Sequence, residues 1–414
     1  MDKLEAVAKF SSAPTGDSTA GDSAAVAGVS PPAVAPPVEH VPPGRPRRRY
    51  PTAVKYWLVA GLVLIFVQVI VGGITRLTGS GLSITKWEIV TGTLPPLSDA
   101  QWESEFALYR DTPQYEKMNE GMSMSDFKFI YFWEYFHRLW ARMMGLVFVI
   151  PLAYFVAKRW IDRRLGKRLA LVFAAAALTA SFGWIMVASG LIERPLVSAY
   201  KLSMHLGIAF ATFGILLWTT LWTFDVRLEP ALSNAEGAKP ATPVRKAVYA
   251  LAAVLVVQIL LGGMMSGMKA ALAYPTWPDL NGAAVPGVLL DASAWTLDNV
   301  VHYDSHPFMS ALVQLLHRTA GYVVAGLVLL LLYRGWRTAH GRWRGALALT
   351  SALTALQVAL GIITVVLSEA VIPVSWGVLH QAGALFLLSA VLYAVWLVRA
   401  APQPPPAPAH SLRP

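Results

Sequence analysis

Eight long apolar segments constrain the fold of this chain more than any other feature of its sequence. Crossing the hydrocarbon core of a bilayer takes about 20 residues of helix, and each segment is roughly that long or longer. Because lipid offers the backbone no hydrogen-bond partner, apolar runs of this length predict transmembrane helices. The predicted spans are residues 55–75, 129–157, 169–189, 200–224, 246–268, 309–333, 345–368 and 373–398.

The composition agrees with a polytopic membrane protein. Of the 414 residues, 55% are hydrophobic and only 14% are charged, whereas soluble domains are about 25% charged. The net charge of +10 does not indicate a nucleic-acid partner, because the basic runs at 44–50, 158–168 and 334–344 lie beside apolar segments. By the positive-inside rule they predict cytoplasmic termini and two long outer loops, at 76–128 and 269–308.

The sequence contains no cysteine. This excludes disulfides, thiolate haem ligation, and iron–sulfur clusters or zinc sites held by cysteine. Any metal bound by this protein therefore has to be held by histidine, methionine or carboxylate side chains.

The two halves of the chain carry matching motifs. Gln68 is followed by Gly72 and Gly73 at the end of the first span, as Gln258 is followed by Gly262 and Gly263 at the end of the fifth. The second and sixth spans contain "FHRLWARMMG" and "LHRTAGYVVAG", and the fourth and eighth each have one histidine near their start. Two four-span units have the same orientation in a membrane, so a pseudo-two-fold axis along the membrane normal relates them. The predicted fold is an all-α integral membrane protein whose eight transmembrane helices form two tandem four-helix bundles.

The predicted domain organisation follows this repeat. An N-terminal four-helix half covers 51–226 and a C-terminal half covers 246–398, joined by a cytoplasmic linker over 227–245. Residues 1–50 and 399–414 are rich in alanine and proline and have no helical period, so they are predicted to be disordered tails.

Four histidines lie in the outer half of spans that run from outside to inside. Polar side chains inside a membrane are costly and usually functional, and two imidazoles on facing helices can clamp a haem iron. A zinc or copper site and a proton relay are alternatives. The two pairs, one in each half, are His137 with His205 and His317 with His380.

Arginines directly follow two of these histidines. Arg138 and Arg318 are candidate partners for haem propionates, although an arginine near a membrane interface is also a common snorkelling residue. Arg76, just past the first span, is a weaker candidate of the same kind.

The halves differ at one position beside the first histidine. Glu134 precedes His137 by three residues on the same helical face, and its equivalent in the second half is Gln314. A carboxylate can accept a proton or stabilise a cation, whereas an amide can only hydrogen-bond. The first half is therefore the candidate reaction site and the second a candidate electron-transfer or structural haem site. The alternative is that Glu134 pairs with Arg138 or Arg142 and is structural.

These residues resemble the haem A synthase family, of the proteobacterial and mitochondrial type. The resemblance covers about residues 50–398 and is carried by "GGITRLTGSGLSITKWEIVTGTLPPL" at 72–97 and "FKFIYFWEYFHRLWARMMG" at 127–145. Some members of that family have cysteine pairs in the outer loops, and this chain has none.

The resemblance implies a membrane oxidoreductase that acts on haem O, for terminal oxidase biogenesis. Its C8 methyl group becomes a formyl group through successive oxidations with water-derived oxygen. It also implies haem b as cofactor, bound by His317 and His380, and substrate haem near His137 and His205, with Glu134 essential.

A bacterial inner-membrane location is expected from the same resemblance, with the haem sites toward the periplasm. Haem O synthase and oxidase assembly factors are candidate partners. The sequence does not identify the electron acceptor, and it leaves open whether the protein forms a homo-oligomer.

Two other functions fit parts of the pattern. A non-enzymatic di-haem b-type electron carrier explains the four histidines but not the difference between Glu134 and Gln314. A haem or quinone transporter is disfavoured because the spans lack Gly/Pro interruptions around a midplane site. His302 and His306 could form an outer metal site, although a loop segment just before a span is more often simply polar.

Overall fold

The computed structural model describes residues 50–86, 91–191, 195–224 and 242–400. These residues contain eight helices that are long and apolar enough to cross a membrane, and no β-strand. The predicted all-α membrane fold is therefore confirmed. The helices are α1 (Thr52–Leu77), α3 (Met124–Ala157), α4 (Arg163–Gly190), α5 (Ala199–Phe224), α6 (Thr242–Gly267), α8 (Phe308–Gly335), α9 (Gly341–Val366) and α10 (Val374–Ala400).

The predicted tails and the predicted linker fall mostly outside the described residues. Where the chain is described, α6 already begins at Thr242, inside the range assigned to the linker, and α10 continues to Ala400. Helix starts are set by caps: the Asp162 side chain, for example, accepts a hydrogen bond from the Leu165 N–H at 2.8 Å and begins α4.

Helix α3 begins at Met124, five residues before the predicted span. Its first turns pack on α2 (Asp99–Arg110), a helix of the first outer loop. Phe106 of α2 stacks on Phe127 of α3 at 4.7 Å between ring centroids, and Tyr109 adds a second aromatic contact. The extra turns thus bury their apolar side chains against the loop rather than in lipid. A five-residue helix, α7 (Leu297–Val301), lies in the second outer loop.

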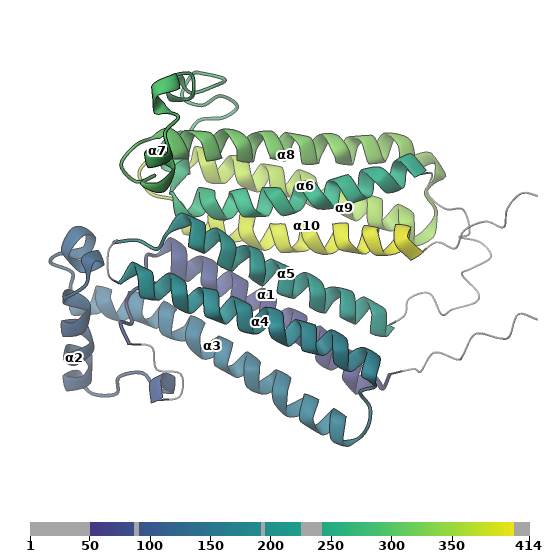
Figure 1. Cartoon of the computed structure of the whole chain (residues 1–414), viewed down its shortest axis with the longest axis horizontal. Coiled ribbons are helices and arrows are strands. Elements are labelled where there is room, and N and C mark those ends of the chain that lie inside the picture. Colours follow the sequence, from purple (N-terminus) through teal and green to yellow (C-terminus); the bar gives the residue numbers. More distant parts are fainter. Residues whose placement is uncertain (1–49, 87–90, 192–194, 225–241, 401–414) are drawn as a thin grey trace, which may run out of the picture. The chain divides into compact units, whose positions relative to one another are not determined.

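The membrane helices pack as four consecutive hairpins: α1 with α3, α4 with α5, α6 with α8, and α9 with α10 (Figure 1). Within the halves, α1 packs on α5 as α6 packs on α10, and between the halves α5 packs on α6 as α1 packs on α10. The pairing pattern therefore recurs along the predicted repeat, while the two-fold axis itself stays a prediction.

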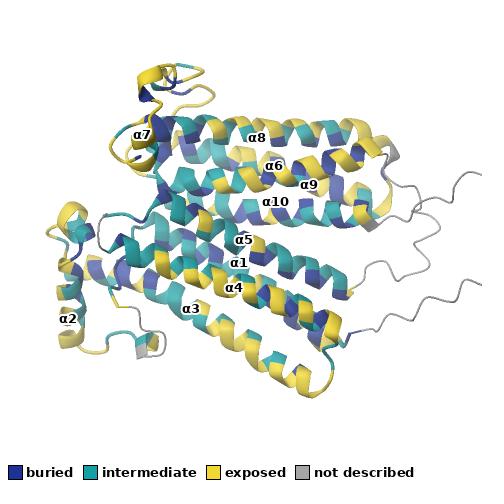
Figure 2. Ribbon diagram, in the orientation of Figure 1, coloured by how far each residue is buried: buried dark blue, intermediate teal, exposed yellow. Residues whose placement is uncertain are grey.

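Small residues bring α5 and α6 into close contact between the halves. A Cβ on Gly267 would lie 2.5 Å from the Cα of Ala199, and a Cβ on Gly263 would lie 2.8 Å from the Cα of Ser203. Small residues spaced four apart on both helices are a common device for helix packing in membranes, where apolar burial gives little driving force. Large apolar side chains on α3 and α4 instead face outward, where lipid would cover them (Figure 2).

We expect Gly267→Ala to destabilise the contact between the halves, because the new methyl group would meet backbone atoms that cannot move away. Overpacking of this kind costs about 1–3 kcal/mol. The measurement is thermal unfolding in detergent followed by tryptophan fluorescence. Gly145→Ala is the matched control, because a Cβ at Gly145 meets nothing within 4 Å. Equal unfolding temperatures for the two variants would contradict the prediction.

Candidate functional site

The four predicted histidines lie on four different helices, each in the second helix of a hairpin: His137 on α3, His205 on α5, His317 on α8 and His380 on α10. The ring centroids of His317 and His380 are 6.4 Å apart. Two imidazole nitrogens bound to one metal at about 2 Å each lie roughly 4 Å apart, and their ring centres about 2 Å further. The spacing of this pair therefore fits one iron between the two rings.

Each histidine ring rests on a glycine of its partner helix. A Cβ on Gly72 of α1 would lie 3.0 Å from Cε1 of His137, and a Cβ on Gly361 of α9 would lie 3.0 Å from Cε1 of His380. Gly183 and Gly262 stand in the same relation to the other two histidines, at 3.1 and 3.3 Å. The missing side chain leaves room for the ring, so we call each glycine a histidine seat.

Sequence reasoning singled out the seats on α1 and α6 and missed those on α4 and α9. The signal was nevertheless present. A polar residue stands four positions before every seat glycine: Gln68, Thr179, Gln258 and Gln357. A polar residue four positions before a glycine is too short a motif to be informative on one helix. It becomes informative only when all four hairpins are compared.

The same polar residues contact the histidines. The amide nitrogen of Gln68 lies 3.1 Å from Nδ1 of His137, and that of Gln258 lies 3.3 Å from Nε2 of His317. The amide of Gln357 donates to the main-chain carbonyl of His380 at 2.8 Å. On α4 the contact uses the backbone, since Nδ1 of His205 donates to the carbonyl of Thr179 at 3.0 Å.

Other metal sites find no support in the described part of the chain. It contains no group of three or more His, Cys, Asp or Glu side chains that could hold a metal ion. His302 Nδ1 bonds to Asp298 at 2.7 Å, and His306 Nδ1 accepts the N–H of Phe308 at 3.2 Å. A pair of facing imidazoles suits a macrocycle that supplies the remaining four ligands, so the histidine pairs fit haem iron better than zinc or copper.

Glu134 is buried beside the first pair and is held by three donors. One oxygen accepts hydrogen bonds from the Ser83 hydroxyl and the Ile84 N–H, both at 2.8 Å. The other oxygen forms an ion pair with Arg138 at 2.5 Å. Only 2% of Glu134 is exposed, and these contacts compensate the cost of burying its charge. The structural pairing with Arg138 considered from the sequence is therefore present.

The two arginines that follow histidines hold the outer loops. Arg138 donates to the carbonyls of Ile84 and Lys86 at 3.1 and 3.0 Å. Arg318 does the same in the second loop, to the carbonyls of residues 274, 276 and 279. Binding of propionates by these arginines stays a prediction. Arg76 does not hold an outer loop in this way. It donates to the last carbonyls of α6, those of Ser266 and Gly267, at 3.0 Å.

Gln314 repeats the position of Glu134 with the opposite hydrogen-bond polarity. Its amide donates to the carbonyl of Tyr274 at 2.7 Å, whereas Glu134 accepts from the Ile84 N–H. The turn that follows is ordered by Asp279, whose pKa is lowered by hydrogen bonds from the Thr276 hydroxyl and the Gly282 N–H. Both halves thus fasten an outer loop next to the histidine pair, but only the first does so with a buried negative charge.

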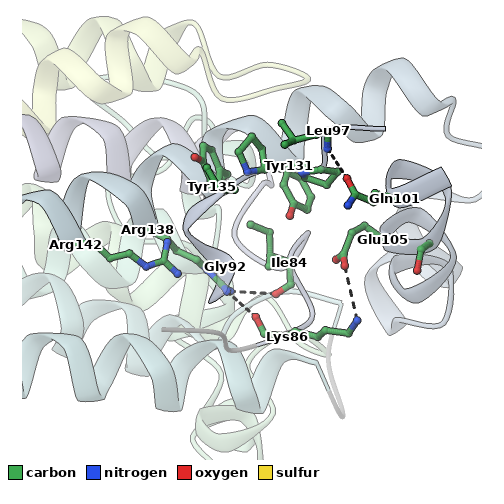
Figure 3. A pocket seen from close by; sticks show the side chains of 14 residues that line it. Ile84, Lys86, Gly92, Leu97, Gln101, Glu105, Tyr131, Tyr135, Arg138 and Arg142 are labelled. Carbon is green, nitrogen blue, oxygen red and sulfur yellow. Dashed lines mark hydrogen bonds and ion pairs between the residues drawn. The ribbon is translucent and has the colours of Figure 1, made fainter. Parts of the chain in front are cut away.

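Arg138, the ion-pair partner of Glu134, lines a cavity of about 340 Å³ on the side of the first outer loop. Figure 3 shows Arg138 reaching toward Ile84 and Lys86, with Tyr131 and Tyr135 on the same helix. The loop, α2 and α3 all contribute to its walls. The cavity gives the outer surface of the first half polar and cationic character next to the buried carboxylate.

The fold and the site together define a multi-pass membrane protein with two interhelical histidine pairs. The chain matches the family model described as cytochrome oxidase assembly protein over residues 55–392. It is 42% identical to the Heme A synthase of Rhodospirillum centenum over 84% of this chain and 89% of that protein. The Heme A synthase of Parvibaculum lavamentivorans is 39% identical over 84% and 93%, and that of Flavobacterium johnsoniae is 38% identical over 81% and 95%. This chain belongs to the haem A synthase family, and the resemblance predicted from its motifs is confirmed.

We expect Gly361→Ala to weaken haem binding in the second half, because the new methyl group would push the His380 ring from its place. Perturbing the support of a metal ligand typically costs 10- to 100-fold in affinity. The measurement is haem retained per chain after washing in detergent. Gly326→Ala is the control, because a Cβ there meets nothing within 4 Å. Equal haem content in both variants would refute the histidine-seat interpretation.

We expect Glu134→Leu to loosen the first outer loop, because the Ile84 N–H loses its acceptor. Hydrogen bonds to charged groups contribute about 1.5–3 kcal/mol, so exchange of this amide should be at least about tenfold faster. Glu134→Gln keeps an acceptor oxygen and should exchange much more slowly than Glu134→Leu. Hydrogen–deuterium exchange of the peptide containing Ile84 tests this, and identical exchange in wild type and Glu134→Leu would contradict it.

Proposed function

We propose that this protein is a membrane oxidoreductase that converts haem O into haem A for terminal oxidase biogenesis. Membership of the haem A synthase family supports this activity. One observation of this chain carries the proposal: a buried carboxylate, Glu134, stands beside the histidine pair of one half, while an amide, Gln314, stands at the same place in the other. Two equal electron-carrying sites would not need this difference.

The proposed assignment places one haem in each half. His137 and His205 bind the substrate, haem O. His317 and His380 bind haem b, which supplies one-electron redox chemistry when bound. The 6.4 Å spacing of the second pair and the glycine under each ring support the assignment, because they leave the imidazoles positioned to bind an iron between helices.

The reaction oxidises the C8 methyl group in two two-electron steps. In the first, the methyl group and one water give a hydroxymethyl group, two protons and two electrons. In the second, the hydroxymethyl group loses two more protons and two more electrons and becomes the formyl group. An external electron carrier takes up the electrons, and haem b, held by His317 and His380, would supply the one-electron redox chemistry for this transfer. The protein contributes placement and electrostatics, and the macrocycle delocalises the charge.

Glu134 suits the electrostatic part of this chemistry. Removing electrons from a methyl group on the ring leaves a cationic centre, which a nearby fixed carboxylate stabilises. A carboxylate has about four acceptor positions, and Ser83, Ile84 and Arg138 account for three of them. The position that remains can take a proton from water as it attacks. The three fixed donors keep the carboxylate oriented while it does so.

The proposed setting is the bacterial inner membrane, with both termini in the cytoplasm and the histidine pairs toward the periplasm. The charge distribution of the loops supports this orientation. Haem O synthase and oxidase assembly factors are the proposed partners, because the substrate and the product are too apolar to travel freely through water.

The test is chromatography of haems extracted from the purified protein after co-expression with a source of haem O. We expect haem A or hydroxylated haem O with the wild type. With Glu134→Gln we expect haem O to accumulate and the oxidised products to fall at least about tenfold, in line with loss of an acid–base group. Glu116→Gln, an exposed acid of the outer loop, should behave like the wild type.

Two results would overturn the proposal in different ways. Full turnover by Glu134→Gln would remove Glu134 from the reaction. If every sample, including the wild type, contains haem b alone, the proposed synthase activity is rejected and the di-haem electron carrier is the remaining function.

A further inference from the structure

We propose that the first half is open to the bilayer between α3 and α4, and that haem O enters its site sideways through this opening. The inference rests on the proposed function for the identity of the substrate and of the half that binds it. It adds a route by which an apolar molecule reaches His137 and His205 from the membrane.

The two halves differ in how completely their helices enclose the bundle. In the second half four pairs of helices pack and close a ring: α6 on α8, α8 on α9, α9 on α10, and α10 on α6. In the first half α3 packs on α1, α1 on α5, and α5 on α4, whereas α3 and α4, both described throughout, share no extended packed face. Only 6% of the apolar stretch of each of α3 and α4 is buried, against 17% of α8 and 22% of α9 (Figure 2). The first bundle therefore lacks one of its four sides.

Aromatic side chains close the inner end of this side. Phe148 of α3 and Phe173 of α4 meet with 5.1 Å between their ring centroids. The apolar cluster beneath them, which includes Trp57, Phe155 and Leu169, joins the inner ends of α1, α3 and α4. The two helices are thus held together on the inner side of these rings.

Outward of the rings, the facing residues are small and exposed. Gly145 and Ala141 lie three and seven residues before Phe148, on the same face of α3, and Ala176 and Ala180 stand in the same relation on α4. All four are exposed, and a Cβ on Gly145 would meet nothing within 4 Å. Small residues in membrane helices usually mark close contacts between helices, but here they border open space. We call these four residues the open side.

The matching positions of the second half are more enclosed. Thr354 stands seven residues before its seat glycine, as Ala176 does, and only 4% of Thr354 is exposed. Ala325 stands eight residues after its histidine, as Gly145 does, and it is half-buried. The open side therefore belongs to the half that carries the buried carboxylate.

The first outer loop covers the outer end of the open side. Leu82 rests on Gly190, the last residue of α4, where a Cβ would lie 2.8 Å from Cδ2 of Leu82. Two residues further along, the Ile84 N–H donates to Glu134 of α3 at 2.8 Å. The loop thus reaches from α4 to α3, and the opening that remains between the loop and the aromatic rings faces the lipid.

The chemistry of haem O fits such an opening. Its long isoprenoid tail keeps the molecule in the bilayer rather than in water. Substrate and product have to exchange in every reaction cycle, whereas a resident haem stays in place, so an open bundle suits the first and a closed ring suits the second. Between Phe148 and His137 the opening extends over about 16 Å of helix, along which the tail lies between small side chains.

The test is the uptake of haem O from lipid vesicles by the full protein, purified with its haem b in nanodiscs and followed by haem absorbance. Gly145→Phe combined with Ala176→Phe fills the open side and should slow uptake at least about tenfold, because binding then requires the helices to move. Gly326→Phe combined with Ala355→Phe is the matched control, since both positions are exposed in the second half and a Cβ on Gly326 meets nothing within 4 Å. Its uptake should equal that of the wild type, and His137→Ala sets the background.

A second test uses one protein as its own control. The chain contains no cysteine, so Gly145→Cys combined with Ala176→Cys supplies two unique thiols, which a bifunctional thiosulfonate reagent bridges across the open side. Bridging should slow haem O uptake at least about tenfold, and a reductant that cleaves the bridge should restore the original rate.

The rates of uptake decide the outcome. Uptake at the wild-type rate by the phenylalanine variant, or equal slowing in its control, would overturn the inference. If the phenylalanine variant loses its haem b, the bridged protein decides, and uptake that bridging does not change overturns the inference. Slower uptake in a protein that makes no haem A would retain the side entrance and reject the proposed activity, so the two can fail separately.

Discussion

Close contact between a histidine ring and a glycine on the neighbouring helix is the interaction on which the rest of this structure depends. An imidazole inside a membrane has to be supported by protein, because lipid offers it neither hydrogen bonds nor a fixed orientation. The glycine allows the two helices of a hairpin to approach, and the polar residue one turn away reaches the histidine. Four hairpins repeat this unit, and together they supply two pairs of rings.

The two halves share this framework but differ in how the outer loop is attached beside the histidine pair. Both fasten an outer loop through an arginine that follows a histidine. In the second half an amide completes the attachment, whereas in the first a buried carboxylate does so. A buried ion pair is weak evidence for stability, since apolar packing often serves as well. In the described residues the carboxylate stands beside one histidine pair and an amide, Gln314, at the matching place beside the other, and this is the difference that the proposed reaction would need.

In the proposed reaction Glu134 would serve both structure and chemistry. Its hydrogen bonds to Ser83 and Ile84 hold the loop, and they also hold the carboxylate still. A charge that is fixed before the reaction stabilises a developing cation without reorganisation. The chain contains no cysteine, so no thiol takes part in this network.

The sequence by itself determined the eight helices, the repeat, the four histidines and the difference between Glu134 and Gln314. These features follow from the length of the apolar segments, from the spacing of the motifs and from residue type, all of which can be read directly from the sequence. Tertiary structure alone decided which helices pair, that Gly183 and Gly361 support histidines, and that Arg138 reaches the carbonyls of the first outer loop. Even the early start of α3 depended on a loop helix that packs against it. These features arise from contacts between residues far apart in the chain, and local pattern carries no information about such contacts.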